Sequence, residues 1–410
     1  MNNDHLINRL DRIKNLVAKP LPVAASQAPA ARYRRLADAV SGEIVTAPSG
    51  AYCRVTTIYP FGHRFGEVSL DPPQQGASVQ VASYTPLECE GEALLSDLLF
   101  VDTETTGLGG SGAVAFLIGC GSLTPQGFEV RQYLLPDYSD EAALLEQVLT
   151  ELRASRTLVS YNGAAFDLNL IRDRFIVNRV ARDVPCAGHF DLLHSARRLF
   201  KRRLNDCTLA NVEREIFGYF RQNDIPGHLM PSIYFDWLQT DSTELFPAVL
   251  EHNRQDILSL YFLLLKVDRV FRTEGAVLDY AEDIYSLSRV YGRRKRSQNI
   301  IANFESLERS SLHPLDNEVI WFHSLAYRRQ GDWHRAVELW RQLVDSPGPE
   351  VYPAALELAM YFEHQVKDIS QALDFSLTAQ RVGPPTRRQG QLLEKRLNRL
   401  REKLAPAGRG

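Results

Sequence analysis

The feature of this 410-residue chain that most constrains its fold is a pair of acidic residues directly after a short apolar run. Residues 98–101 are all apolar, and Asp102 and Glu104 follow them with Thr103 between. Side chains alternate along a strand with a period of two, so both carboxylates point to the same side. Two acids at the end of a buried strand repel each other and lose hydration, which is costly unless a cation lies between them. The pattern predicts either a Mg²⁺ or Mn²⁺ site or an ordinary strand-end turn with Glu104 in solvent.

Composition excludes several classes of protein. Hydrophobic residues make up 44% and charged residues 24% of the chain, which is ordinary for a globular protein. The net charge of −3 means that nucleic-acid binding would need a local basic surface. The five cysteines form no CxxC pair, which argues against a zinc site or a disulfide framework. With no signal-peptide core and no apolar run of about 18 residues, we expect a cytoplasmic protein without a membrane span.

The sequence pattern divides the chain into four segments. Residues 1–31 predict an amphipathic helix, over 5–18, and a Pro/Ala-rich linker. Residues 32–95 hold short β-like pieces and predict a small β-rich N-terminal extension. Residues 96–272 begin with three strands, a helix, a strand and a helix, which indicates a mixed α/β domain. Residues 282–404 are almost wholly helical in pattern.

The helical segment contains two similar helix pairs. Ala326 and Ala359 are 33 residues apart, close to the tetratricopeptide period of about 34 residues. The spacing of Ala326, Gly331 and Ala336 resembles that repeat, whereas the second copy has Lys367 in place of the glycine. We expect these repeats to bind a protein partner.

Two further acids complete a possible constellation. Asp167 opens a helix shortly after a predicted strand, where it could equally be an ordinary cap. Asp256 lies in an apolar helix, and His252, four residues earlier, shares its face. That pair fits a metal ligand with a general base, or an exposed His–Asp pair on a surface helix.

Asp102, Glu104, Asp167 and Asp256 resemble the four acids of the DEDD exonuclease superfamily, and their surroundings resemble its YprB-like members. The matching segments span about residues 95–270: 100–108 with 115–119, 189–199, and 224–227 with Pro231 and Tyr234. The resemblance implies an α/β fold with a ribonuclease H-like mixed sheet flanked by helices, followed here by an all-α tetratricopeptide-like domain.

The resemblance also implies a metal-dependent nuclease, in particular a 3′→5′ exonuclease that uses two divalent cations, Mg²⁺ or Mn²⁺. Asp102 would bridge both ions, Glu104 and Asp256 would complete one site, and Asp167 would bind the other. His252 would accept the proton of the attacking water. In the superfamily the last acid follows Tyr with three residues between, or His with four. Here His stands at the Tyr spacing, which turns the imidazole by about 100° around the helix.

Substrate contacts are predicted at six positions. Arg197, Arg198 and Lys201 form a basic run that could follow a phosphate backbone or could be a solvated face. Thr105 lies in the first matching segment, Asn162 could contact the terminal nucleotide or form a turn, and Phe166 could stack on a base or pack in the core.

The expected substrate is a single-stranded end of DNA or RNA. The sequence leaves two alternatives open: a non-catalytic scaffold that binds nucleic acid or protein through the helical repeats, and a structure-specific endonuclease on the same fold.

Overall fold

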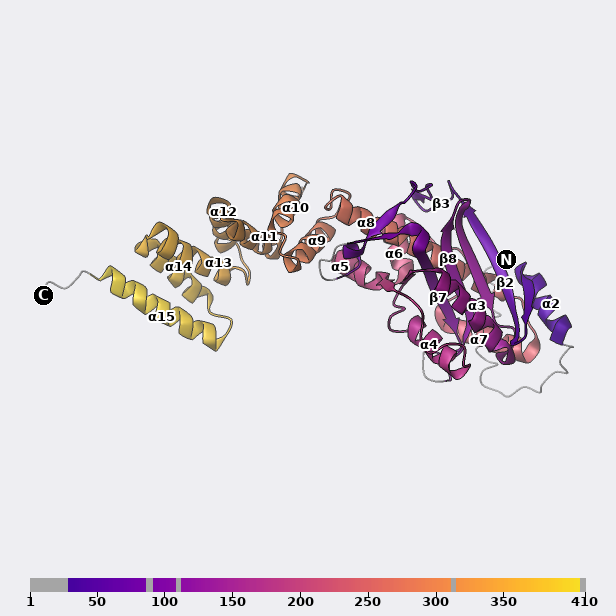
Figure 1. Ribbon diagram of the computed structural model, residues 1–410. Helices are drawn as coiled ribbons and strands as arrows, with labels where there is room; N and C mark the ends of the chain where they lie inside the picture. Colours follow the sequence, from indigo (N-terminus) through magenta and orange to yellow (C-terminus); the bar gives the residue numbers. More distant parts are fainter. Residues whose placement is uncertain (1–28, 86–90, 108–111, 311–314, 406–410) are drawn as a thin grey trace. The chain divides into compact units, whose positions relative to one another are not determined.

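A computed structural model describes residues 29–85, 91–107, 112–310 and 315–405. The predicted helix over 5–18 lies outside these residues. The chain divides into two compact units, Met1–Val277 and Leu278–Gly410, which we call the sheet unit and the helical unit (Figure 1). No helix in the described residues combines the length and apolarity needed to cross a bilayer.

The sheet unit is built on a mixed sheet of seven strands in the order β1-β2-β9-β8-β7-β10-β11. Neighbours from β1 to β7 are antiparallel, and β7, β10 and β11 are parallel. This mixed sheet with its helices confirms the ribonuclease H-like fold class. The strands are β1 (Glu43–Ala47), β2 (Gly50–Pro60), β7 (Leu98–Thr105), β8 (Ala115–Thr124), β9 (Gly127–Leu134), β10 (Thr157–Ser160) and β11 (Gly188–Asp191).

The first two strands of the sheet come from residues 32–95, the segment predicted as a small β-rich N-terminal extension. β2 pairs with β9 from Cys53↔Leu134 to Pro60↔Gly127, and β1 pairs with β2 at the sheet edge. Helix α2 (Pro29–Val40), which precedes them, begins in the last three residues of the predicted linker and continues into the segment predicted as β-rich. Among the described strands, two short ladders stay outside the main sheet: β3 (Arg64–Phe65) with β4 (Val68–Ser69), and β5 (Ser78–Gln80) with β6 (Glu92–Leu94).

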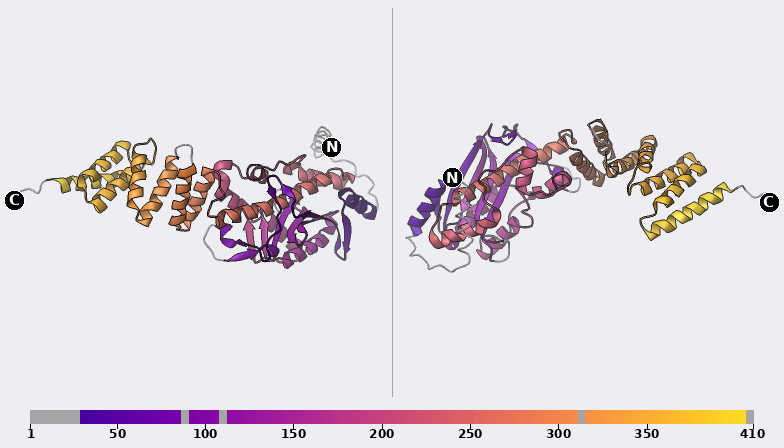
Figure 2. Two further views of the ribbon diagram at one scale, coloured as in Figure 1. Left: turned by 90° about the horizontal axis from the view of Figure 1, so that it is seen from above. Right: turned by 180° about the vertical axis from the view of Figure 1, so that it is seen from behind.

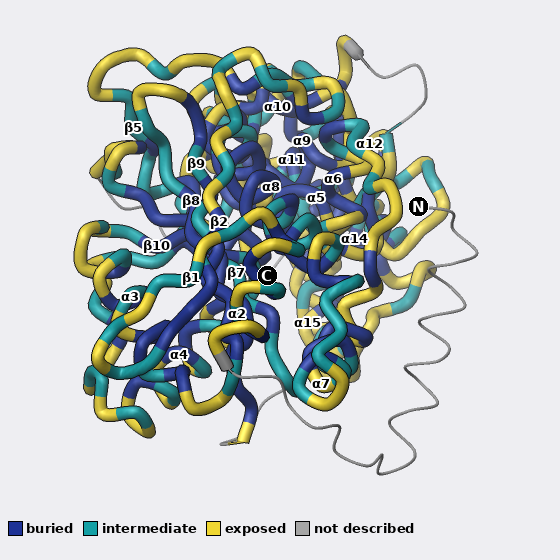
Figure 3. Tube along the Cα trace, turned by 90° about the vertical axis from the view of Figure 1, so that its right-hand side faces the viewer, coloured by how far each residue is buried: buried dark blue, intermediate teal, exposed yellow. Residues whose placement is uncertain are grey.

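Helices cover both faces of the sheet. The long helix α8 (Phe246–Arg272) crosses one face over β7, β8 and β9 (Figure 2, right), and buried residues follow this contact (Figure 3). Helix α3 packs on β2 and β9, and its leucines share a core with Leu99 and Val101 of β7. The remaining bounds are α3 (Glu141–Ala154), α4 (Asp167–Val177), α5 (Leu192–Leu204), α6 (Leu209–Phe217) and α7 (Met230–Thr240).

The helical unit stacks consecutive helices against one another. They are α9 (Ala281–Arg293), α10 (Ser297–Ser310), α11 (Asn317–Gln330), α12 (Trp333–Val344), α13 (Val351–Tyr361), α14 (Ile369–Val382) and α15 (Arg387–Leu404). A π-helical turn, Phe362–Val366, follows α13. This all-helical region confirms the fold class predicted for the C-terminal part.

The two helix pairs share one junction. Gly331 ends α11 with a φ of 81°, and Asp332 caps α12 by accepting a hydrogen bond from the backbone N–H of Arg335 at 3.0 Å. In the second copy Lys367 adopts the same left-handed backbone, with a φ of 62°, and Asp368 caps α14. The degenerate second copy therefore keeps the turn geometry of the first, although Lys367 carries a Cβ that glycine lacks.

We predict that Asp332→Ala and Asp368→Ala each destabilise the first turn of the following helix by about 1 kcal/mol, because each removes the acceptor of a capping bond. Hydrogen-exchange mass spectrometry measures this as faster exchange in the peptides of α12 and α14. Asp374→Ala, at an exposed position inside α14, is the control. Equal exchange in the cap and control variants would contradict the shared junction.

Candidate active site

The carboxyl ends of three parallel strands meet at one edge of the sheet. In the central strand β10, Val159 pairs with Phe100 of β7, and Ser160 pairs with Asp191 of β11. Asp102 and Glu104 close β7 at this edge, and Asn162 follows β10 there. Ligand sites of open α/β sheets form at such edges because the loops after the strands diverge there.

Asp102 points toward helix α8, on the same side of β7 as Phe100, whose ring contacts Tyr261 of α8. The fully buried Asn253 donates from Nδ2 to the Asp102 carboxylate at 2.8 Å. Asn253 Oδ1 in turn accepts from Gln132 Nε2 at 2.9 Å. This buried chain of amides fixes the Asp102 carboxylate against the helix. Asn253 escaped the sequence analysis because an amide beside a histidine carries no distinctive signal.

Glu104 lies on the same side and meets His252 of α8. His252 Nε2 is 3.7 Å from Glu104 Oε1 and 3.6 Å from Asp256 Oδ2, while Nδ1 is 2.6 Å from Asp224 Oδ1. Burial opposes protonation of this imidazole, but the hydrogen bond to Asp224 and the charges of Asp256 and Glu104 outweigh it. They raise the His252 pKa to about 9.

Arg221 is a site residue that the sequence analysis missed. Its guanidinium is 7% exposed, donates to the carboxylate of Asp256, and also donates to Glu213 Oε1 at 2.5 Å. A second nitrogen is 3.4 Å from Asp224. Burial lowers the pKa of Arg221. The carboxylates of Glu213 and Asp256 raise it by more, so the net shift is upward. The one signal available was Asp224, which lies in a segment that matches the YprB-like pattern.

Asp167 is the first residue of α4 and approaches the site from the other side of β7. The hydroxyl of Thr103, which points away from the Asp102 side, donates to the Asp167 carboxylate. Burial raises the Asp167 pKa, and the charges of Asp191 and Asp256 add to it. The bonds from Thr103 and from the backbone N–H act in the opposite direction, and the pKa is about 6.

The predicted acids influence one another electrostatically. Burial, then Asp256, Asp167 and Glu104, raise the Asp102 pKa well above its ordinary range. Burial raises the Glu104 pKa to about 8; the charge of His252 lowers it, and those of Asp256 and Asp167 raise it. A cluster with such repulsion favours a positive charge among its members.

The four acids have the donor chemistry of a Mg²⁺ or Mn²⁺ site. In the described part of the chain, however, no three His, Cys, Asp or Glu side chains converge closely enough to hold a metal ion as they stand. Two of the four carboxylates have protein partners: Arg221 donates to Asp256, and Asn253 donates to Asp102.

The comparisons with known proteins agree with this fold. Residues 99–267 match the family model of the RNase_H superfamily. The chain is 34% identical over 329 residues to the "Uncharacterized protein YprB" of Bacillus subtilis (strain 168), covering 78% of this chain and 79% of that protein. The chain belongs to the YprB family. The predicted resemblance to YprB and to ribonuclease H-like proteins is confirmed, and the nuclease activity stays a prediction.

A solved structure is also similar, although distantly. It is the family B DNA polymerase from the hyperthermophilic archaeon Pyrobaculum calidifontis, at 14% identity and a TM-score of 0.35. The similarity covers 73% of this chain and 35% of the polymerase chain.

The predicted substrate contacts next to the acids differ in their surroundings. The ring of Phe166, directly before Asp167, is 54% exposed and not part of the core. Asn162 adopts a φ of 66°, and its backbone N–H donates to Asp191 Oδ1 at 2.8 Å. Thr105 is partly buried and donates to the carbonyl of Gly107 at 2.8 Å.

The basic run of α5 divides into two groups. Arg197 and Lys201 are exposed and line a pocket together with Asn162. Arg198 instead donates to Ser195 Oγ at 2.9 Å and to the carbonyl of Thr85. The structure thus separates Arg198 from the two residues with which the sequence grouped it.

We predict that Arg221→Gln lowers the free energy of unfolding by about 3–5 kcal/mol, because it leaves a buried carboxylate unpaired. That carboxylate belongs to Glu213, whose side chain is fully buried. Urea denaturation measures the change. Arg214→Gln, which breaks an exposed pair with Glu215, is the control with an expected loss of about 0–1 kcal/mol. Adding Glu213→Gln to Arg221→Gln should recover stability; no recovery would show that the two residues are not coupled.

We also predict a pH-dependent contribution from His252. An unfolded histidine has a pKa of about 6.5, whereas folded His252 has a pKa of about 9. The stabilisation is therefore fully present below about pH 6.5 and is lost as the pH rises through about 9. The stability gap between the wild type and His252→Gln should shrink between about pH 6 and about pH 10. The same change at the exposed His228 is the control, and a gap independent of pH would contradict the prediction.

Proposed function

We propose that this protein is a metal-dependent nuclease that hydrolyses phosphodiester bonds, acting as a 3′→5′ exonuclease on single-stranded ends. The observation that supports the proposal is the mutual electrostatic influence of four acids from three separate elements. Asp102 and Glu104 come from β7, Asp167 from α4 and Asp256 from α8. The charge of Asp256 raises the pKa of each of the other three.

Asp102, Glu104, Asp167 and Asp256 would hold two divalent cations, Mg²⁺ or Mn²⁺. When bound, the cations would supply a water of lowered pKa and stabilise the leaving oxygen. For Asp256 to serve as a ligand, Arg221 has to release its carboxylate, since one oxygen is now committed to the guanidinium. Arg221 can stay paired with Glu213 in that event, because it already contacts both acids.

His252 can act as a general base only in its neutral form. With a pKa of about 9 its imidazole is protonated at neutral pH, and an imidazolium cannot accept a proton from water. The charges of Asp256 and Glu104 contribute to that pKa. Divalent cations bound at Asp256 and Glu104 would offset these charges and lower the pKa of His252. The imidazole would then be available as a base, with its Nδ1 held by Asp224.

A second candidate function is a non-catalytic scaffold. It is favoured by the pairing of Arg221 with Asp256, which neutralises a predicted ligand without any metal. In that case the helical unit, which we propose as the binding surface for a protein partner, would be the working part of the chain.

The test is a digestion series with end-labelled single strands of DNA and RNA in Mg²⁺ or Mn²⁺. We expect the wild type to shorten them from the 3′ end and Asp102→Asn or Asp167→Asn to be slower by about a hundredfold or more, because charge stabilisation at the phosphate is lost. Asp173→Asn, at an exposed position of the same helix as Asp167, is the control and should keep full activity.

Two further arms separate the alternatives. A circular single strand is resistant to an exonuclease, so its cleavage would indicate an endonuclease. Calorimetric titration with Mn²⁺ should show divalent-cation binding that the Asp102→Asn variant weakens. If the wild type neither cleaves more than the variants nor binds the cation, the nuclease proposal fails and the scaffold stands.

A further inference from the structure

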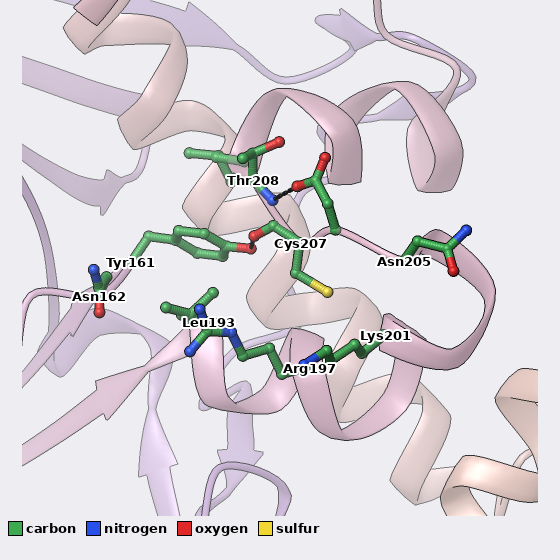
Figure 4. A pocket seen from close by; sticks show the side chains of 10 residues that line it. Tyr161, Asn162, Leu193, Arg197, Lys201, Asn205, Cys207 and Thr208 are labelled. Carbon is green, nitrogen blue, oxygen red and sulfur yellow. Dashed lines mark hydrogen bonds between the residues drawn. The ribbon is translucent and has the colours of Figure 1, made fainter. Parts of the chain in front are cut away.

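A pocket of about 520 Å³ (Figure 4) includes Asn162, which follows β10 at the sheet edge that carries Asp102 and Glu104. Tyr161 and Asn162, which follow β10, form one side, Arg197 and Lys201 of α5 a second, and Thr208 at the start of α6 a third. The volume falls within the range of about 300–1,000 Å³ that is typical of small-molecule sites. The pocket is therefore large enough for a nucleotide.

The positive charge of this pocket comes from two side chains on one face of a helix. Arg197 and Lys201 are four residues apart, so they are neighbours on the surface of α5. Within the described residues neither side chain forms a hydrogen bond or an ion pair, in contrast to that of Arg198. Two adjacent cations without partners are suited to a phosphate group.

The opposite wall of the pocket adds hydrogen-bond donors and contains one acidic side chain. Asp206 is the acid that lines the pocket, and its carboxylate accepts from the backbone N–H of Thr208 at 2.6 Å. Thr208 precedes α6 and its hydroxyl makes no capping bond. The hydroxyl and the first N–H groups of α6 thus remain available to an anion. Tyr161, whose hydroxyl donates to the Cys207 carbonyl, and Leu193 supply apolar surface.

The pocket is joined to the acidic site by a short, fixed turn. Asp191, at the end of β11, accepts from the backbone N–H groups of Asn162 at 2.8 Å and Ala164 at 3.2 Å. Asp167 begins α4 three residues after Ala164, and the exposed ring of Phe166 lies between.

We propose that this pocket receives one internal nucleotide of a single-stranded nucleic acid whose end lies at the four acids. Arg197 and Lys201 contact its phosphate, and Tyr161 and Leu193 contact its base. The inference rests on the proposed function and adds a binding site for its single-stranded substrate. A single strand fits better than a duplex, because the chain has a net charge of −3 and this pocket offers two cations rather than an extended basic surface.

The experiment measures binding of a fluorescein-labelled oligothymidylate to the full chain by fluorescence anisotropy, in EDTA. We expect Arg197→Gln with Lys201→Gln to weaken binding by about ten- to hundredfold. The slope of log K against log salt should fall by about 0.7, since both side chains contact one phosphate and each phosphate contact on a single strand contributes about 0.7. Gln keeps the helix propensity of α5 while removing the charge.

The matched control removes two other positive charges. Arg153 and Arg182 are exposed and lie before the starts of β10 and β11, at the sheet edge opposite the acids. Their double change to Gln should leave affinity and salt slope within about twofold of wild type. An equal loss in both double variants would overturn the proposal, because it would indicate a non-specific effect of net charge.

A scan with methylphosphonates locates the contact. Replacing one phosphate at a time by an uncharged methylphosphonate should weaken wild-type binding at one internal position. The same replacement should have no effect in the Arg197/Lys201 double variant, as expected for a coupled pair. A flat scan of the wild type would overturn the proposal. Because EDTA removes divalent cations, binding is measured whether or not the protein cleaves, so the two proposals fail separately.

Discussion

The candidate site depends on the close approach of helix α8 to strand β8. A Cβ at Gly119 would lie 2.2 Å from Ile257 Cδ1 and 2.3 Å from Asn253 Oδ1, so a larger residue would clash with these two buried side chains of the helix. This contact brings Asn253 to Asp102 and puts His252 and Asp256 above the end of β7. A glycine on a neighbouring strand therefore determines whether the acids of the sheet and of the helix meet.

Electrostatics explains why this arrangement is stable without a cation. Carboxylates that lose hydration and repel one another need compensating charge. Arg221 provides it to Asp256 and Glu213, and the imidazolium of His252 provides it to Asp224 and Glu104. Under the proposed function, divalent cations would compete with the positive side chains of the protein itself. Arg221 is the side chain on which that competition would act most directly.

Local patterns in the sequence predicted a mixed α/β domain followed by helices, and the resemblance to YprB-like proteins added the ribonuclease H-like type of the sheet. The apolar run before Asp102 and the stripe of α8 each specify an element without reference to the rest of the chain. The pairing of β2 with β9 could not be read in this way, because partners some 75 residues apart leave no mark in a local pattern. Arg221 was missed for a similar reason: an arginine in a connecting segment reads as solvated, and only the folded chain shows that Glu213 and Asp256 surround it.

Asp191 shows how one carboxylate can serve the site without being a ligand. It caps α5 through the Leu193 N–H at 3.1 Å and also holds the turn that begins at Asn162. Its oxygens are thereby occupied by backbone donors, which is the ordinary use of an acid at a helix start. The same bonds place the pocket wall and the start of α4 in a fixed relation. The distance from a nucleotide in the pocket to Asp167 is then set by the fold, which is what binding of a strand in one register requires.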